Sequence, residues 1–262
     1  MNTSIAPALA APLSAHTSLD VTQTGPVLHV RLNPFPQDDT LSAAVLDELI
    51  DVLDSLHERP DIRVLVLSSS GEDFCLGADR REFQEALASD PTAGALRRVA
   101  DKAHRLCQAL ETTHAVTIAR LHGKVIGAGL ALAAHCDLRA GADTARFRMP
   151  EVGIGLAPAW GGAMGRLIWE AGAARIRELM LTCDVFDAAT AHQLGLLHKV
   201  APIEQLDDVV AAWTKPLARR SPEALVLTKR MLTAYAKAAR TGDITLLDSH
   251  LLTSRLTPPA RS

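Results

Sequence analysis

The chain has 262 residues, of which 48% are hydrophobic and 22% charged, a composition typical of a globular protein rather than a disordered or fibrous one. Its formal net charge of -3 offers no basic surface for a nucleic acid or an anionic membrane, so we expect neither as a partner. The four cysteines have no C-x-x-C spacing, which argues against a disulfide framework or a zinc site and favours a reducing, cytoplasmic setting.

Residues 1–17 are rich in Ala, Pro and Ser and carry no Lys or Arg. Because a basic start and a long apolar run are both missing, we expect a flexible leader rather than a secretory signal. Nowhere does the chain contain about 18 consecutive apolar residues, so no membrane-spanning helix is predicted.

Residues 18–202 are predicted to form an α/β core that opens with a β-α-β unit. Residues 27–32 alternate and are rich in aliphatic side chains, and residues 62–67 (IRVLVL) form a near-continuous apolar run, as expected of buried strands. Between them, residues 42–56 place apolar side chains at spacings of three and four, which predicts an amphipathic helix facing a sheet.

The alternation of helix and strand continues along the core. We expect a helix over residues 96–110 and a short strand over residues 115–119. A turn containing Gly127 and Gly129 then opens an apolar helix.

Residues 203–262 have an almost entirely helical pattern and are predicted to form a C-terminal helical region. Pro216 and Pro222 interrupt it and are expected where helices end or begin.

Two segments place the start of a helix after a glycine turn, namely residues 74–79 (FCLGAD) and 126–131 (IGAGLA). The first N–H groups of a helix have no partner within the helix and lie at the positive end of its dipole, so they favour an anion. Either segment alone is more often plain turn geometry. Two of them converging on one point would form an oxyanion hole.

Four motifs in one order carry a resemblance to a known family. Residues 74–79 resemble F-x-x-G-A-D, and residues 122–137 (HGKVIGAGLALAAHCD) resemble N-G-x-x-x-G-G-G followed by C-D. Residues 147–162 are similar to F-x-x-P-E-x-x-x-G-x-x-P-x-x-G-G, and residues 181–202 to L-T-G, a short helix and G-L-V-x-x-V-x-P. These are motifs of the enoyl-CoA hydratase/isomerase (crotonase) superfamily, and the resemblance runs from about Leu19 to Arg255.

The resemblance implies an α/β fold of the ClpP/crotonase-like kind, a spiral of β-β-α units forming two sheets, followed by a helical C-terminal region. It implies an acyl-CoA substrate that itself carries the CoA, with no separate cofactor and no metal. It also implies assembly as a homotrimer or a dimer of trimers.

By motif position, the resemblance assigns the oxyanion donors to the backbone N–H groups of Ala78 and Ala128. Ala128 replaces the usual middle glycine, but an alanine keeps the N–H and can adopt helical φ. The neighbouring positions expected to contact substrate are Gly77, Asp79, Gly127, Ala131 and Trp160.

Of the two glutamates that hydratases of this family use, only the second is retained, as Glu151. The first position is Ala131, and the position of an isomerase-type acid is Ala159. A single carboxylate still permits proton abstraction, double-bond migration or decarboxylation. Trp160 either lines a pocket for a flat or bulky acyl group or packs in the core.

Several other polar residues have two interpretations each. His122 and His135 could replace the lost acid, although structural roles are more common for such residues. Arg80, Arg81, Lys229 and Arg230 could meet CoA phosphates or a substrate carboxylate, or lie solvated at the surface. The chain ends without the family's usual E-G-x-x-A-F segment, which suggests an open pocket or a variant subunit arrangement.

The leading hypothesis is a CoA-thioester lyase or isomerase with Glu151 as its main acid and base. The alternative is a non-catalytic, acyl-CoA-binding subunit of the same fold, motivated by Ala131. A serine hydrolase is disfavoured because no serine follows either glycine turn, and a Rossmann dehydrogenase because G-x-G-x-x-G is missing after the first strand.

Overall fold

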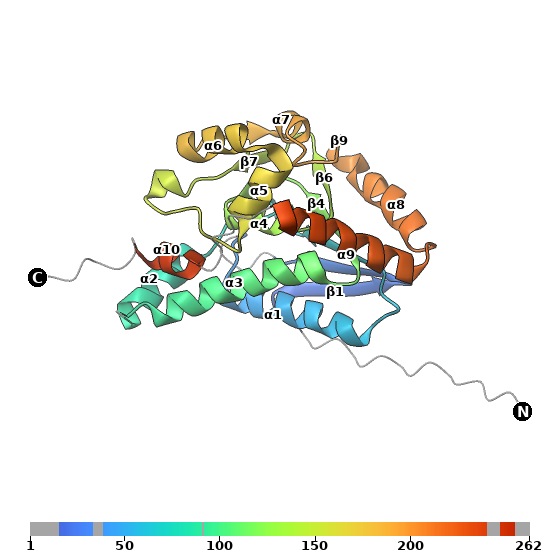
Figure 1. The fold of residues 1–262 in the computed structure, drawn as a ribbon, viewed down its shortest axis with the longest axis horizontal. Coiled ribbons are helices and arrows are strands. Elements are labelled where there is room, and N and C mark those ends of the chain that lie inside the picture. Colours follow the sequence, from blue (N-terminus) through green and yellow to red (C-terminus); the bar gives the residue numbers. More distant parts are fainter. Residues whose placement is uncertain (1–15, 34–38, 91, 240–246, 255–262) are drawn as a thin grey trace, which may run out of the picture.

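The computed structural model describes residues 16–33, 39–90, 92–239 and 247–254. Most of the predicted leader, and the last eight residues, therefore lie outside the described residues. The described chain forms two sheets with helices packed around them (Figure 1).

The larger sheet has six strands in the order β1-β2-β3-β4-β6-β9. Their bounds are Leu19–Thr24 (β1), Val27–Leu32 (β2), Val64–Ser69 (β3), Val116–Leu121 (β4), Leu138–Ala142 (β6) and Lys199–Ala201 (β9). Strands β1 and β2 are antiparallel, and every other neighbouring pair is parallel. The apolar character of β3 follows from this position, because an inner strand of a parallel sheet is covered on both faces.

The smaller sheet consists of three short strands in the order β5-β7-β8. They are Lys124–Ile126 (β5), Arg146–Arg148 (β7) and Phe186–Asp187 (β8). Phe147 and Phe186 pair across β7 and β8, and their rings stack at 5.5 Å. This sheet matters for the site because β5 and β7 each lead into a segment that carries a candidate catalytic residue.

The helices fall into groups around the sheets. The bounds of those preceding the site are Ala43–Ser55 (α1), Leu56–Glu58 (η1), Arg80–Ser89 (α2), Gly94–Thr112 (α3) and Ala128–Ala134 (α4). The later ones are Val152–Ile154 (η2), Ala163–Ala171 (α5), Ala173–Thr182 (α6), Ala188–Gln193 (α7), Ile203–Gln205 (η3), Leu206–Leu217 (α8), Pro222–Ala239 (α9) and Asp248–Ser254 (α10). In Figure 1, α1 and α3 lie along the lower side of the molecule, and α5, α6 and α7 along its upper side.

The opening β-α-β unit is confirmed, with β2 and β3 parallel and α1 between them. Ser42 is the N-cap of α1, its side chain accepting a hydrogen bond from the N–H of Val45 at 3.3 Å. Pro222 opens α9 as expected, whereas Pro216 lies inside the last turn of α8.

One contiguous hydrophobic core joins the larger sheet, α1, the second half of α3 and α4. Every residue of α4 is buried, which explains why this short segment is apolar on all sides. Within the described residues, no helix combines the length and the apolar character needed to cross a membrane.

Candidate active site

The two glycine turns lie side by side in the structure. The segment around Cys75 runs beside β5: the N–H of Cys75 donates to the carbonyl of Lys124 at 3.2 Å, and the N–H of Ile126 donates to the carbonyl of Cys75 at 2.9 Å. A Cβ placed on Gly77 would lie 3.4 Å from the carbonyl oxygen of Ile126 and 3.9 Å from the nitrogen of Ala128. The two turns are therefore as close together as an oxyanion hole would require.

Gly129 makes this approach possible. A Cβ at that position would lie 2.6 Å from the Cβ of Cys75 and 2.7 Å from its carbonyl oxygen. Only a glycine lets α4 pack this closely on the neighbouring segment. Sequence reasoning used Gly129 as a turn signal and missed this packing role, which the pair of glycines separated by one residue could have suggested.

Ala78 and Ala128 present the two candidate N–H donors. Ala128 is the first residue of α4, so its N–H has no acceptor within the helix. Ala78 precedes Asp79, the N-cap of α2. Neither N–H donates a backbone hydrogen bond to any other residue that the structure describes.

Asp79 caps α2 rather than lining the pocket. Its Oδ1 accepts from the N–H of Arg81 at 2.8 Å and from the N–H of Glu82 at 3.4 Å. Asp79 is not among the residues that line the pocket, and its carboxylate is engaged by the first turn of the helix, so a contact with substrate remains a prediction.

Glu151 lies next to the second glycine turn. Its Oε1 would be 2.9 Å from a Cβ placed on Gly127, and Gly127 has φ +50° and ψ -112°, a conformation that L residues rarely adopt. Burial raises the pKa of the Glu151 carboxyl, against a smaller lowering by a hydrogen bond from its own backbone. Glu151 thus combines a raised proton affinity with a position beside the donors.

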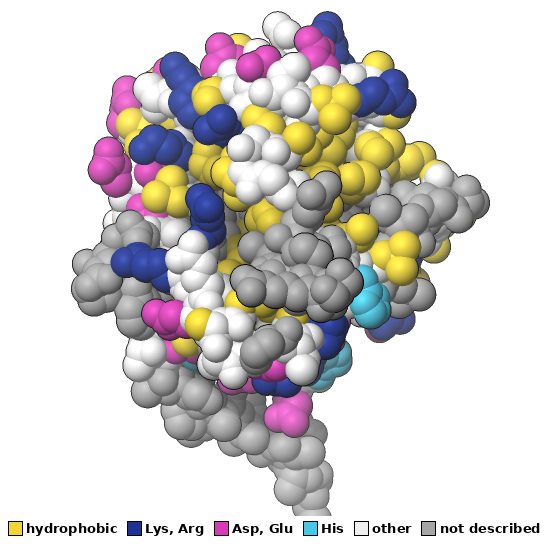
Figure 2. Space-filling model, turned by 90° about the vertical axis from the view of Figure 1, so that its left-hand side faces the viewer, with side chains coloured by type: hydrophobic (Ala, Val, Ile, Leu, Met, Phe, Trp, Pro, Cys, Tyr) yellow, Lys and Arg dark blue, Asp and Glu magenta, His cyan; other side chains and the backbone are white. Residues whose placement is uncertain are grey.

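A pocket of about 90 Å³ joins these groups. Its lining includes Gly77, Ala78, Arg80, Phe83, Gly127, Ala128, Glu151, Ile154, Leu156, Ala159 and Trp160. The wall away from the donors is apolar, and Trp160 is only 7% exposed. Figure 2 shows the end of the molecule that carries α2 and α10, where hydrophobic side chains gather in the upper half.

Glu151 is the one carboxylate among the described residues that line this pocket. Ala131 does not line it: this residue is buried within α4, where its N–H donates to the carbonyl of Gly127 at 3.0 Å. Ala159 contributes a methyl group to the wall. Ala131 thus lies outside the pocket lining, and the substrate contact expected there remains a prediction.

The two histidines considered as replacement acids have structural partners. A ring nitrogen of His122 lies 2.9 Å from the carbonyl oxygen of Gly71, and one of His135 lies 2.8 Å from that of Ala131. Both histidines are buried outside the pocket.

Lys229 is buried and cannot meet a CoA phosphate. Its Nζ donates to the carbonyls of Leu110 at 3.0 Å and Ala115 at 2.8 Å, and it pairs with Asp137 at 2.7 Å. Arg230 and Arg81 are exposed. Arg80 lines the pocket, so it remains the candidate to meet a CoA phosphate or a substrate carboxylate.

A larger polar groove of about 460 Å³ lies between the larger sheet and α8. There Arg120 of β4 forms an ion pair with Asp207 at 2.5 Å. The carboxylate that lines this groove is therefore already paired. None of the predicted site residues lines it. In the described part of the chain, no three His, Cys, Asp or Glu side chains are grouped as a metal site.

Residues 22–256 match the model of a family described as enoyl-CoA hydratase/isomerase. A probable enoyl-CoA hydratase of Mycobacterium bovis is 30% identical over 191 residues, covering 73% of this chain and 71% of that protein. A crotonyl-CoA hydratase of Syntrophomonas wolfei is 34% identical over 170 residues, covering 64% and 63%. Among solved structures, AtuE of Pseudomonas aeruginosa is similar with a TM-score of 0.78 and 28% identity, over 83% of both chains.

Proposed function

This chain belongs to the enoyl-CoA hydratase/isomerase family, and from that premise we propose that it moves a proton on an acyl-CoA thioester, with Glu151 as acid and base. The family and fold predicted from the four motifs are confirmed. The observation that carries the proposal is the single pocket carboxylate beside two converging N–H groups.

In the proposed mechanism, the thioester carbonyl oxygen accepts hydrogen bonds from the N–H groups of Ala78 and Ala128. When a proton leaves the acyl chain, the electron pair moves toward this oxygen and forms an enolate. Fixed donors stabilise that charge without reorganising, and one such donor typically contributes about a hundredfold to a thousandfold in rate.

Glu151 takes the proton and returns it. Its carboxylate removes a proton from one carbon of the acyl chain, and the resulting acid delivers the same proton to another carbon, so the double bond migrates with no net change in composition. Hydration would need a second acidic group to activate water. The two positions where the family carries such a group are Ala131 and Ala159, whose methyl side chains cannot do so. One carboxylate therefore favours isomerisation over hydration.

The apolar wall supports an apolar, flat or bulky acyl group. Phe83 and Trp160 offer aromatic surface, and Leu156 and Ile154 add aliphatic contact. Arg80, on the same lining, would meet a negative group of the CoA portion. No separate cofactor is needed, because the CoA arrives with the substrate.

We also propose a homotrimer or a dimer of trimers. Helix α9 exposes a broad apolar face made of Leu227, Met231, Leu232 and Tyr235, each 59% exposed or more. A contiguous apolar face of this kind is typical of a protein interface. All four cysteines are free and buried, which supports work in a reducing compartment such as the cytoplasm.

The loss of acids at Ala131 and Ala159 also favours a second candidate, a subunit that binds acyl-CoA without turning it over. The two candidates differ in one measurable property. The enzyme converts a thioester, whereas the binding subunit only retains it.

The test is turnover of 3-enoyl-CoA and 2-enoyl-CoA thioesters by the purified protein and by Glu151→Gln. We expect the wild type to interconvert double-bond isomers, and Glu151→Gln to lose on the order of a hundredfold to ten-thousandfold in kcat. Glu178→Gln, on the exposed surface of α6, is the matched control and should leave kcat unchanged.

A pH profile adds a second readout. Because burial raises the pKa of Glu151 and the carboxylate form is the base, kcat/KM should rise with pH through a midpoint above the ordinary carboxyl value. Full activity of Glu151→Gln would overturn the assignment. Tight thioester binding without any conversion would favour the binding subunit.

A further inference from the structure

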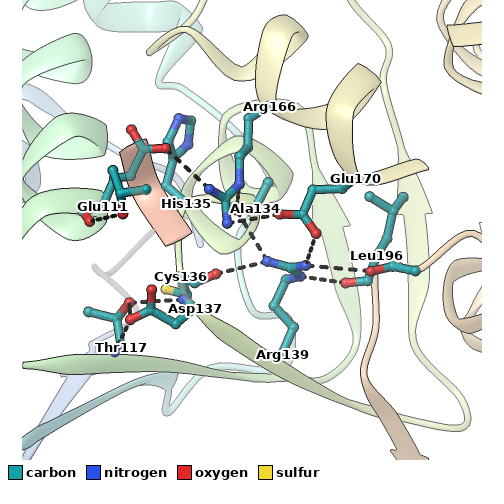
Figure 3. Close-up of polar contacts among 12 residues, drawn as sticks. Glu111, Thr117, Ala134, His135, Cys136, Asp137, Arg139, Arg166, Glu170 and Leu196 are labelled. Carbon is teal, nitrogen blue, oxygen red and sulfur yellow. Dashed lines mark hydrogen bonds and ion pairs between the residues drawn. The ribbon is translucent and has the colours of Figure 1, made fainter. Parts of the chain in front are cut away.

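A buried ionic cluster of Arg139, Arg166, Glu170 and Glu111 lies at the C-terminal end of α4, the end opposite Ala128 (Figure 3). Arg139 of β6 is 1% exposed, and its Nη1 donates to the carbonyls of Cys136 at 2.8 Å and Ala134 at 3.2 Å. Its Nη2 pairs with Glu170 of α5 at 2.7 Å. A buried guanidinium needs such a partner, because an unpaired buried charge is strongly destabilising.

Arg166 of α5 reaches the same point of α4 from the other side. Its Nε donates to the carbonyl of Ala134 at 3.1 Å, so this carbonyl accepts from two guanidinium groups. Its Nη2 pairs with Glu170 at 2.8 Å and its Nη1 with Glu111 of α3 at 3.2 Å. Glu170 therefore bridges both arginines. Arg139 of β6 and Arg166 of α5 bond to the last residue of α4, and Glu111 of α3 is paired with Arg166.

Helix α4 has no polar side chain with which to fix its own position. All seven of its residues are buried and carry Gly, Ala or Leu side chains. Small apolar side chains resist sliding less than interlocked large ones, so the hydrogen bonds to its terminal carbonyls are the directional contacts that locate its C-terminal end. A shift at Ala134 would be carried along the two-turn helix to Ala128.

The same cluster includes side chains of α5, the helix that follows Trp160 in the chain. Trp160 lines the pocket and lies three residues before the start of α5, the helix that carries Arg166 and Glu170. Arg166 thus connects α4, which begins with the candidate donor Ala128, to α5, which follows Trp160.

We propose that Arg166 and Glu170 are positioning residues, which fix the Ala128 N–H against the substrate carbonyl through the carbonyl of Ala134. The inference rests on the proposed function, since it gives the cluster a role in polarising a thioester. The required accuracy is high, because a displacement of about 1 Å in an active site can cost roughly a hundredfold in rate.

The test measures polarisation directly. A dimethylaminocinnamoyl-CoA thioester is bound to the full-length protein, and the red shift of its absorption band reports hydrogen bonding to its carbonyl. Kinetic constants are measured in parallel, at a temperature where circular dichroism shows each variant folded. Variants are Arg166→Met, Arg166→Lys and the isosteric Glu170→Gln.

We expect Arg166→Met to lower kcat by about tenfold or more, to change KM by less than about twofold, and to reduce the red shift. Arg166→Lys keeps a cation between Glu111 and Glu170 but lacks the fork that also reaches Ala134, so it should recover only part of both losses. Arg175→Met removes an exposed arginine from an ion pair on α6 and should match the wild type.

Folded Arg166→Met and Glu170→Gln proteins with the wild-type red shift and kcat would overturn the positioning role and leave the cluster with a stability role only. If Arg166→Met does not fold, Glu170→Gln alone decides, since it retains the shape of the side chain. No red shift in the wild type would instead overturn the oxyanion assignment and, with it, this inference.

Discussion

Gly127 connects the two halves of the candidate site at a single residue. It precedes the donor Ala128, and the carboxylate of Glu151 lies where its side chain would begin. Its positive φ adds a second reason for glycine. The proposed donor follows Gly127 in the chain and the proposed base lies against it, so a substitution of Gly127 should affect both.

Substituting Gly127→Ala should lower kcat/KM by on the order of a hundredfold, because the new methyl group displaces Glu151 or twists the turn that presents Ala128. Gly172→Ala is the matched control: its φ is +84° but nothing lies within 4 Å of its Cβ. That control should cost about 1–3 kcal/mol of stability and keep its activity. The measurements are steady-state kinetics and urea denaturation, and equal activity losses in both variants would contradict the shared-position account.

At the residue scale, motif positions predicted the placement of Ala78, Ala128, Glu151 and Trp160. The capping role of Asp79 could not be predicted, because an aspartate that caps a helix and one that binds a ligand have the same local sequence. The packing of Gly129 on Cys75 depends on a contact between segments more than 50 positions apart, which local pattern does not encode.

Among the elements, α9 departs from the usual pattern of buried apolar and exposed charged side chains. It buries Lys229 and exposes Leu227, Met231 and Leu232. The periodicity predicted a helix but not its orientation, since a lysine is normally expected on the solvated side. The three-dimensional reason is that two carbonyls and Asp137 surround the Lys229 ammonium group.

Replacing Lys229 by Met should lower the free energy of unfolding by about 1–3 kcal/mol, because it removes the ion pair with Asp137 and the hydrogen bonds to the carbonyls of Leu110 and Ala115. Chemical denaturation followed by circular dichroism measures this loss. Lys215→Met, at an exposed position of α8, should change stability by less than about 0.5 kcal/mol. A Lys229→Met protein as stable as the wild type would show that α9 docks by apolar packing alone.

Short elements escaped prediction for a different reason. Strands β5, β7 and β8 have two or three residues each, too few for a period of two to be recognised. They become strands only because the smaller sheet forms around Phe147 and Phe186. The family resemblance implied two sheets, while the residue pattern alone did not.

At the scale of the whole molecule, the apolar face of α9 predicts an assembly that one substitution can break. Leu232→Glu places a charge on that face and should convert a trimer into monomers, since burying an unpaired carboxylate is unfavourable. Size-exclusion chromatography with light scattering gives the mass. Arg230→Glu, on the same helix but off the apolar face, is the control and should remain assembled.

A monomeric wild type, or a Leu232→Glu protein that keeps its mass, would contradict the role of this face. An unchanged mass of Leu232→Glu would direct attention to the exposed Trp169 of α5 and Leu181 of α6, two helices on the opposite side of the fold from α1 (Figure 1).

The packing of Cys75 against Gly129 has a consequence for the enzyme's own survival. Conjugated thioesters are electrophiles that alkylate thiolates, and this thiol lies directly beneath the turn proposed to hold one. Burial raises the pKa of Cys75 to about 12, so almost none of it is thiolate at neutral pH. If the proposed substrate carries a conjugated double bond, the burial and protonation of Cys75 should protect this thiol from alkylation.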